Sequence, residues 1–408
     1  MVLERAPRPH PRFSDIVGAL DRHMAANAAV AWLFAVTGPL VILLAVASKA
    51  GLSREDTASW IFGGYALGGV FSILMSYLYR QPIGIAWTIP GAVLVGPALG
   101  HLSFPEVIGA YLATGALLVV LGLSGLVRKV MALVPMPIVM GMVSGIFLPF
   151  ALKIVAGFAD DPAIAFAVVA AFFAASAVPQ LGRFLPPVLA ALVVGVIAVT
   201  ASGHMALQEP AHFEFAHPRI FMPVFSARAL LELVVPLAVT VIGIQNAQGC
   251  AILAAAGYEP PANMLALVCG VGSILYGLVG SVSACVTGPS NAIMCASGSK
   301  ERRFAAGILY GLLMLGFGLL APLAAQLGLA LPGAFIGVLG GLAMVRVLQG
   351  SLATAFGGEL ALGALATFLV TVSGVTILNI GAAFWGLVIG VATSWFLERP
   401  ALRKVWHG

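Results

Sequence analysis

The side chains that could do chemistry in this sequence lie within long apolar stretches, and most of them are neutral. Gln245, Asn246 and Gln248 stand near the middle of the apolar run 228–255. Burial of a side-chain amide in lipid is costly unless the amide is paired. The cluster therefore indicates either hydrogen bonds between helices or a binding site. Since the three amides cannot share one helix face, we expect Gln245 and Gln248 on one side and Asn246 on another.

Two further motifs place a threonine two residues before a proline. Thr88 precedes Pro90 and Thr287 precedes Pro289, each in its own apolar run. Proline suits the first turn of a helix, where its missing N–H costs nothing. Each motif therefore predicts a short extended strand followed by a half-helix that begins near the middle of a membrane. Two ordinary proline-kinked helices are the alternative.

The expected half-helices would begin with free backbone N–H groups, which carry the positive end of the helix dipole. Extended backbone at this depth is tolerated only inside protein or beside a cavity. Two such helix starts facing each other would bracket a mid-membrane site suited to an anion. The expected free N–H groups are those of Gly91, Ala92, Val93, Ser290, Asn291 and Ala292.

Ionisable side chains are scarce in these runs, although one inside a membrane is a functional hypothesis by default. Most carboxylates fall at expected helix starts, where they act as caps and dipole partners. Glu232 fits that pattern least well, and it lies roughly 20 Å along a helix from Gln245. His101 ends its apolar run and could titrate, although a single histidine there is also typical of a membrane interface. Glu232 and His101 are the candidates for carrying a proton.

Aromatic side chains could add an apolar wall to the site. Phe34, Tyr65 and Trp87 lie in three different apolar runs, and packing in the core or against lipid is the alternative for each. The sequence Thr37-Gly38-Pro39 predicts a local unwinding of the first run. The expected binding residues are therefore Phe34, Thr37, Tyr65, Thr88, Pro90, Gly91, Ala92, Gln245, Asn246, Thr287, Ser290 and Asn291.

Lipid must be the solvent for the elements that position these residues. The 408 residues are 61% hydrophobic and only 9% charged, and the mean hydropathy is +1.07. A soluble domain carries about 25% charged residues, so soluble enzymes, nucleic-acid binders and secreted disulfide scaffolds are excluded. The four cysteines lie in apolar stretches and favour small buried hydrophobes over metal ligands or disulfides. We expect neither a metal nor a cofactor.

Known catalytic patterns are missing from the sequence. It contains no Ser/His/Asp, HExxH or metal-ligand cluster, and no ATP-binding loop of the form GxxxxGK[ST]. We therefore expect no enzyme, and we expect a gradient to drive any transport. The first 26 residues are polar and lack the apolar core of a cleavable signal peptide, so the first apolar run should remain in the membrane.

The apolar runs predict an all-helical polytopic protein with about fourteen transmembrane segments, since one span needs about 20 residues. Their length favours helices over the short strands of a barrel. With the N-terminus inside, every Lys and Arg except Lys49, Arg54, Lys153, Arg219 and Arg228 falls on the cytoplasmic side, and so do both termini. The expected segments are 27–48, 58–78, 82–101, 106–127, 134–153, 162–179, 186–203, 228–255, 262–279, 281–298, 304–327, 332–349, 358–378 and 381–397.

The two halves of the chain resemble each other. GGVFSIL at 68–74 matches CGVGSIL at 269–275, and LVVGVIA at 192–198 matches LVIGVAT at 387–393. Two weaker matches keep the same order. Because seven spans per half is odd, the second half would start on the opposite side, which is the inverted repeat typical of transporters. Coincidence in an apolar composition is the alternative.

Several of these stretches resemble a known family. Residues 245–249 (QNAQG) with 254–261 (AAAGYEPP), 86–92 (AWTIPGA) and 372–387 (VSGVTILNIGAAFWGL) are similar to the BenE family of benzoate/proton symporters. The likeness runs over nearly the whole chain at similar spacing. Residues 285–303 (CVTGPSNAIMCASGSKERR) depart from the family pattern.

The family looks like a branch of the nucleobase and sulfate-type permeases. The resemblance implies a seven-plus-seven inverted repeat with a core and a gate domain, and a substrate site between the two half-helices. Nucleobase members carry acidic residues where this sequence has Gln245 and Asn291, which argues against a nucleobase. The implied parts are a cytoplasmic tail (1–26), the core (27–127 and 228–327), the gate (128–203 and 328–397), an extracytoplasmic linker (204–227) and a cytoplasmic tail (398–408).

We therefore expect a secondary active transporter of the bacterial inner membrane. It would take up benzoate or a similar aromatic or organic carboxylate with protons, by alternating access. The expected partners are a small organic anion, protons and the lipid bilayer, with no nucleic acid, and a homodimer is compatible with the sequence. An inorganic-anion permease of the sulfate or bicarbonate type and an uncoupled anion facilitator or channel of the same fold remain as alternatives.

Overall fold

The structure is a computed structural model that describes residues 3–6, 10–133, 135–178, 187–204, 213–296, 298–375, 377 and 382–407. Several expectations fall partly or wholly outside these residues. They are Arg8, Arg183, residues 205–212 of the expected linker, part of the stretch 372–387, and the ends of the expected segments at 134, 179, 186, 378 and 381.

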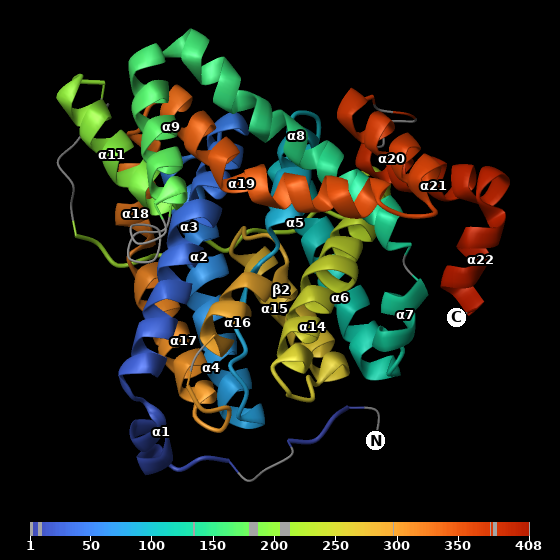
Figure 1. The fold of residues 1–408 in the computed structure, drawn as a ribbon, viewed down its shortest axis with the longest axis horizontal. Helices are drawn as coiled ribbons and strands as arrows, with labels where there is room; N and C mark the ends of the chain where they lie inside the picture. The colour runs from blue at the N-terminus through green and yellow to red at the C-terminus, as the bar shows by residue number, and fades with distance from the viewer. Residues whose placement is uncertain are drawn as a thin grey trace.

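Helices make up most of the described chain (Figure 1). The first half contains α1 (Phe13–Ala19), α2 (Arg22–Lys49), α3 (Arg54–Phe62), η1 (Gly63–Leu67), α4 (Gly68–Tyr79), β1 (Ile85–Trp87), α5 (Ile89–Ala98), α6 (Phe104–Ser124), α7 (Val127–Leu133), α8 (Met136–Asp160), α9 (Pro162–Ala177) and α11 (Pro187–Ala201). The second half contains α12 (Ala227–Ala229), η2 (Leu230–Val234), α13 (Val235–Ala238), η3 (Val239–Asn246), α14 (Ala247–Ala255), α15 (Ala262–Leu278), β2 (Ala284–Val286), α16 (Gly288–Cys295), α17 (Arg303–Leu319), α18 (Ala321–Leu329), α19 (Gly333–Phe356), α20 (Ala361–Ser373), α21 (Ala382–Leu397) and α22 (Arg399–His407).

Six of the described helices are long and apolar enough to cross a membrane, by length and composition. Six further apolar helices are shorter, with 10–17 residues each. The fourteen crossings therefore stay a prediction. Within the expected segment 304–327, helices α17 and α18 meet at a bend of 65°.

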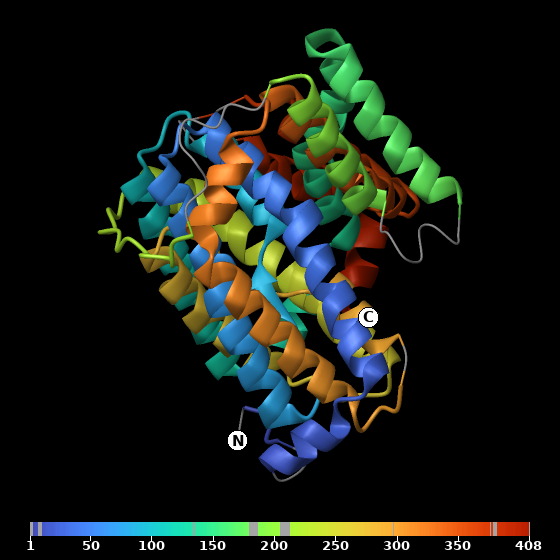
Figure 2. The ribbon, with the colours of Figure 1, turned by 90° about the vertical axis from the view of Figure 1, so that its left-hand side faces the viewer.

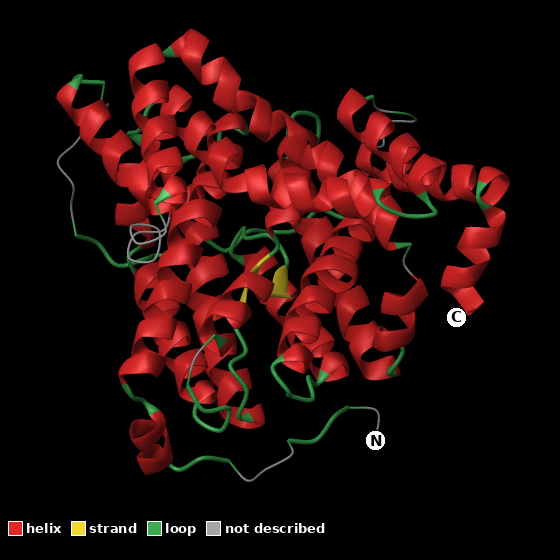
Figure 3. Ribbon diagram, in the orientation of Figure 1, coloured by secondary structure: helices red, strands yellow, loops and turns green. Residues whose placement is uncertain are grey.

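Two short strands cross at the centre of the molecule, enclosed by helices (Figures 2 and 3). β1 and β2 pair antiparallel, with Ala86 opposite Cys285. The pairing continues past both strand ends, because Thr88 N–H donates to Ser283 O at 3.0 Å and Thr287 N–H donates to Gly84 O at 2.9 Å. Helices α5 and α16 therefore begin from one hydrogen-bonded crossing.

Glycines bring the two halves into close contact. A Cβ on Gly69 of α4 would lie 2.4 Å from the carbonyl oxygen of Gly311 on α17, and one on Gly311 would lie 2.6 Å from that of Gly69. Gly115 of α6 and Gly270 of α15 repeat this reciprocal contact at 2.8 Å. Small residues allow membrane helices to approach this closely. Each half thus supplies one member of both crossings.

Helix α2 corrects one expectation, because it stays helical through Thr37, Gly38 and Pro39. A proline inside a helix cannot donate to the carbonyl four residues earlier, which here belongs to Ala35. The hydroxyl of Tyr65 donates to that oxygen at 2.9 Å. The freed carbonyl is therefore satisfied by a neighbouring helix, and no unwinding is needed.

The remaining long helices form a separate group. Helices α8, α9, α11, α19, α20 and α21 lie together at the top of the view in Figure 1, whereas α4, α6, α14, α16 and α17 lie below them. Within the upper group, α8 packs on α19 and α20, α20 packs on α21, and α9 packs on α11. The strand crossing belongs to the lower group.

Candidate functional site

The start of α5 closes most of its own hydrogen bonds. The Thr88 side chain accepts from Gly91 N–H at 3.2 Å, and the Thr88 carbonyl accepts from Ala92 N–H at 2.9 Å. The Thr88 hydroxyl in turn donates to the Thr240 hydroxyl at 3.1 Å. The expectation that Gly91 and Ala92 present free N–H groups is therefore wrong. The cause is that the helix begins at Ile89, one residue before Pro90, and Thr88 caps it.

The start of α16 is more open. Its N-cap residue, Thr287, donates its hydroxyl to the Ser290 hydroxyl at 3.1 Å instead of accepting a backbone N–H. Asn291 N–H bonds Thr287 O at 3.1 Å, which corrects the expectation that it is free. Within the described part of the chain, the backbone N–H groups of Gly288 and Ser290 have no hydrogen-bond partner. The free N–H groups at the crossing are therefore those at the start of α16.

The two buried asparagines hold the strands in place. Asn291 Oδ1 accepts from Gly84 N–H at 2.7 Å, and Asn246 Oδ1 accepts from Val286 N–H at 2.8 Å. Both side chains are buried, and the Nδ2 donor of each has no hydrogen-bond partner among the described residues. Each amide thus fixes one strand end with its oxygen and keeps its donor unused near the crossing.

The glutamines of the same stretch lie differently. Gln245 is nearly buried, and no hydrogen bond to its side chain is present among the described residues. Gln248 is exposed, and its Oε1 would lie 2.7 Å from a Cβ on Gly288, at the first residue of α16. The structure therefore places Gln248 beside the free N–H groups of that helix.

Tyr65 and Trp87, two of the three aromatic side chains of the expected wall, are buried in the packed core. The Tyr65 ring makes edge contacts with Trp87 and Phe317, at centroid distances of 6.4 and 5.0 Å, and the side chain has no exposed surface. Phe34 is half-buried on α2, and the Thr37 hydroxyl bonds back to Leu33 O at 2.7 Å. In this conformation Tyr65 connects α2, through Ala35 O, with Trp87 of β1, whereas the Thr37 hydroxyl bonds only within α2.

The two candidate proton carriers meet, although they lie far apart in the sequence. His101 Nε2 is 3.0 and 3.1 Å from the two carboxylate oxygens of Glu232. Glu232 is 5% exposed and sits on the π-helix η2, while His101 follows the end of α5. Irregular π-helical turns are frequent at functional sites. The pair links the half-helix to the first turns of the amide-bearing helix.

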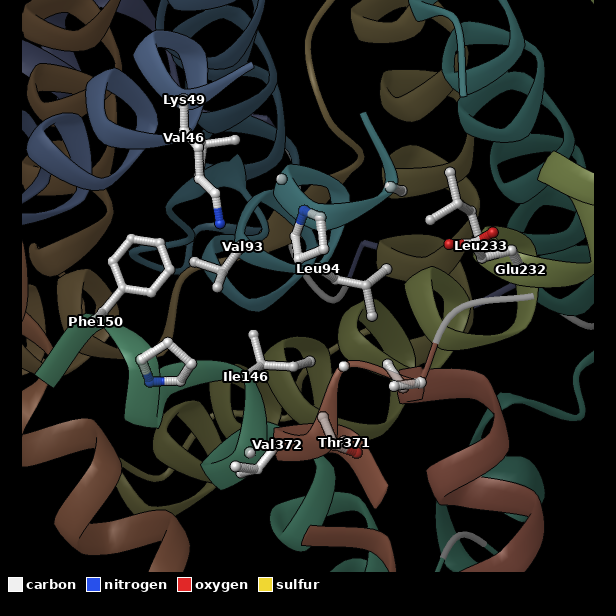
Figure 4. A pocket seen from close by; sticks show the side chains of 18 of the residues that line it. Val46, Lys49, Val93, Leu94, Ile146, Phe150, Glu232, Leu233, Thr371 and Val372 are labelled. Atoms are coloured by element: carbon white, nitrogen blue, oxygen red, sulfur yellow. The ribbon is translucent and has the colours of Figure 1, made fainter. Parts of the chain in front are cut away.

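Both residues line a cavity of about 250 Å³ that we call the Lys49 cavity. Its walls come from α2, α5 and η2 on one side and from α8, α20 and α21 on the other. Val93, Leu94, Ile146, Phe150 and Val372 give it an apolar lining (Figure 4). The position of Lys49 in this cavity could not be expected from the sequence, because Lys49 lies at the end of a helix in the first half of the chain.

Known proteins resemble this chain over most of its length. The family model described as "Benzoate membrane transport protein" (BenE) matches residues 21–396. "Inner membrane protein YdcO" of Escherichia coli (strain K12) is 31% identical over 88% of this chain and 92% of its own length. The "Benzoate membrane transport protein" of Acinetobacter baylyi is 29% identical over 91% of this chain and 94% of its own.

Solved structures share the fold at low sequence identity. The transmembrane domain of a cyanobacterial bicarbonate transporter, BicA, superposes with a TM-score of 0.63 at 18% identity, over 94% of this chain and 99% of that one. The murine Solute Carrier 26 family member A9 anion transporter in its inward-facing state gives 0.61 at 14% identity, over 98% and 74%. These likenesses establish the fold class, which is that of a mostly helical polytopic membrane protein.

Proposed function

Because the chain belongs to the BenE family of benzoate membrane transport proteins, we propose that it carries benzoate or a similar aromatic carboxylate across the membrane together with protons. The family and its relatives are membrane transporters, not enzymes. The relative from Acinetobacter, whose name specifies benzoate, supports the choice of substrate. The inner-membrane name of the Escherichia relative supports the same location for this chain. The distribution of Lys and Arg favours a cytoplasmic position for both termini.

The crossing of β1 and β2 is the observation that carries the proposal. It brings the free N–H groups of Gly288 and Ser290 and the unused amide donors of Asn246 and Asn291 to one buried place. None of the residues that form the crossing is a carboxylate. Donors without competing negative charge suit a carboxylate substrate.

An inverted repeat of seven segments per half fits the contacts within this crossing. Ser72 accepts from Ile85 N–H, the first of β1, at 2.7 Å, and Ser273 accepts from Ala284 N–H, the first of β2, at 3.0 Å. The reciprocal glycine contacts of α4 with α17 and of α6 with α15 each join one helix from the first half to one helix from the second. Each of the fourteen expected segments contains at least part of a helix, which supports the proposed count.

Alternating access would come from motion of the gate (128–203 and 328–397) against the core (27–127 and 228–327). The upper helices of Figure 1 belong to the proposed gate, and the crossing belongs to the proposed core. The Lys49 cavity lies between the two sets of helices, as expected for a path that opens and closes by their relative motion.

The His101–Glu232 pair is the proposed proton carrier. It is the one ionisable pair among the residues that line the cavity. A His101→Gln variant should retain exchange of benzoate between equal pools and lose the response to a pH gradient. His204→Gln is a matched control, because His204 pairs with Asp161 on the surface. An unaltered gradient response in His101→Gln would remove the pair from the coupling mechanism.

Substrate identity is tested with purified protein in detergent. Benzoate should raise the melting temperature in a concentration-dependent way, because a ligand that binds only the folded state stabilises it. Sulfate, bicarbonate and uracil serve as competitors. Stabilisation by sulfate or bicarbonate, and none by benzoate, would favour the inorganic-anion permease instead.

A further inference from the structure

The Lys49 cavity is separate from the strand crossing. It reaches α5 at Val93 and Leu94 and continues to the end of that helix, whereas Thr88, Gly91 and Asn291 do not line it. Two prolines, Pro97 and Pro149, lie in its walls. The crossing therefore accounts for none of the polar groups in this cavity.

Charge is sorted along the cavity. The Lys49 side chain descends past Val46, and its amino group points toward Val93, while Glu232 lies at the opposite end of the view in Figure 4. No hydrogen bond or ion pair of the Lys49 amino group is present among the described residues. Glu232 is already paired with His101. Helices α8, α20 and α21 add no ionisable side chain to the lining.

The space between the two charged ends is apolar. Val93 and Leu94 from α5 face Ile146 and Phe150 from α8, with Val372 of α20 beside them (Figure 4). A small-molecule site commonly combines an apolar lining with a few polar groups that fix orientation. The volume of about 250 Å³ lies just below the range of about 300–1,000 Å³ that holds drug-sized ligands. It suits a single-ring molecule.

We propose that the Lys49 cavity is a second binding site for an aromatic monocarboxylate, which the substrate occupies before or after the strand crossing. The Lys49 ammonium group binds the carboxylate, and the apolar residues of α5 and α8 enclose the ring. Glu232 orients the ligand, because its carboxyl oxygens at the far end disfavour a second carboxylate there and leave that end to the uncharged ring edge. This site rests on the proposed transport of a carboxylate.

The geometry predicts the ligand preference. Benzoate should bind better than acetate, because acetate leaves the apolar walls unfilled. Benzene-1,4-dicarboxylate should bind worse than benzoate, because its second carboxylate would approach Glu232. A preference for the dicarboxylate over benzoate would contradict the proposed orientation.

The experiment measures benzoate uptake into proteoliposomes by Lys49→Met and by Lys153→Met. Lys153 is also exposed, lies on α8 and does not line the cavity, so it controls for the loss of one positive charge. Lys49→Met should raise KM about threefold to tenfold, as expected for one partly exposed charge-assisted hydrogen bond. Lys153→Met should leave KM within twofold, and Lys49→Arg should restore most of the affinity.

A second variant tests the cavity without changing charge. Val372→Trp should fill the apolar space and raise KM in the same way, with the melting temperature as a check on folding. Wild-type KM in both Lys49→Met and Val372→Trp, in a protein that transports benzoate, would overturn this site and leave the proposed function standing. Absence of benzoate transport by the wild type would overturn both.

Discussion

At the scale of single residues, the polar side chains at the strand crossing form hydrogen bonds with the backbone. Thr88 caps α5, and Asn246 and Asn291 each bind a strand N–H through the amide oxygen. Their types and positions could be recognised in the sequence, because amides and prolines are rare in the middle of apolar runs. The sequence could not show which of their atoms form hydrogen bonds, because the donors Gly84 N–H and Val286 N–H lie 207 and 40 residues away along the chain.

Asn291 allows these two roles to be separated. Asn291→Leu removes the acceptor of Gly84 N–H and should lower the free energy of unfolding by about 1–3 kcal/mol, the cost of an unsatisfied buried donor. Asn291→Asp keeps an acceptor and adds a negative charge beside the proposed anion site. Measurements of thermal unfolding and of uptake should therefore show that the Asn291→Asp protein is folded but does not transport. Full uptake by Asn291→Asp would place the substrate elsewhere.

Tyr65 should act through the carbonyl that Pro39 frees. Tyr65→Phe removes the donor to Ala35 O and should destabilise the protein by about 1–3 kcal/mol. Tyr77→Phe is the control, because no hydrogen bond of the Tyr77 hydroxyl is present in the described part of the chain. Melting temperatures in one detergent compare the two variants, and equal values would show that the bond contributes nothing.

At the scale of elements, turn and proline signals located helix starts closely, but they could not decide which proline interrupts a helix. Helices α5 and α16 begin at Ile89 and Gly288, one residue before the expected prolines. Pro39 was expected to unwind α2, and the helix continues because Tyr65 supplies the missing donor. The 65° bend after α17 does have a local signal, because Pro322 occupies the first turn of α18 and cannot continue the preceding helix. Outcomes that depend on a partner from another helix cannot be predicted from local sequence.

The strand starts provide a test of equivalence between the halves. Ser72→Ala and Ser273→Ala each leave the first N–H of a strand without its acceptor. Each should lower the free energy of unfolding by a similar amount, about 1–3 kcal/mol. Ser202→Ala serves as a control, because its exposed hydroxyl only donates to Val199 O. A large loss in one variant and none in the other would argue against equivalent roles.

At the scale of the whole molecule, the reciprocal glycine contacts join the two halves. Gly311→Ala should destabilise the protein, because its Cβ would lie 2.6 Å from the Gly69 carbonyl oxygen. Gly316→Ala on the same helix meets nothing within 4 Å and should be neutral, or stabilising by up to about 1 kcal/mol. Thermal unfolding of both variants measures the difference. Equal melting temperatures would show that the close approach is not required.

Proton-driven transport of a carboxylate by this protein is tested most directly by one measurement. Initial rates of radiolabelled benzoate uptake are recorded in proteoliposomes at a fixed external pH, well above the pKa of benzoic acid, while the internal pH is varied. Protein-free vesicles give the diffusion of the neutral acid, which at early times does not depend on internal pH. The saturable, protein-dependent rate should rise as the interior is made more alkaline and fall when a protonophore collapses the gradient. A protein-dependent rate that ignores the internal pH, or no such rate at all, would contradict the account.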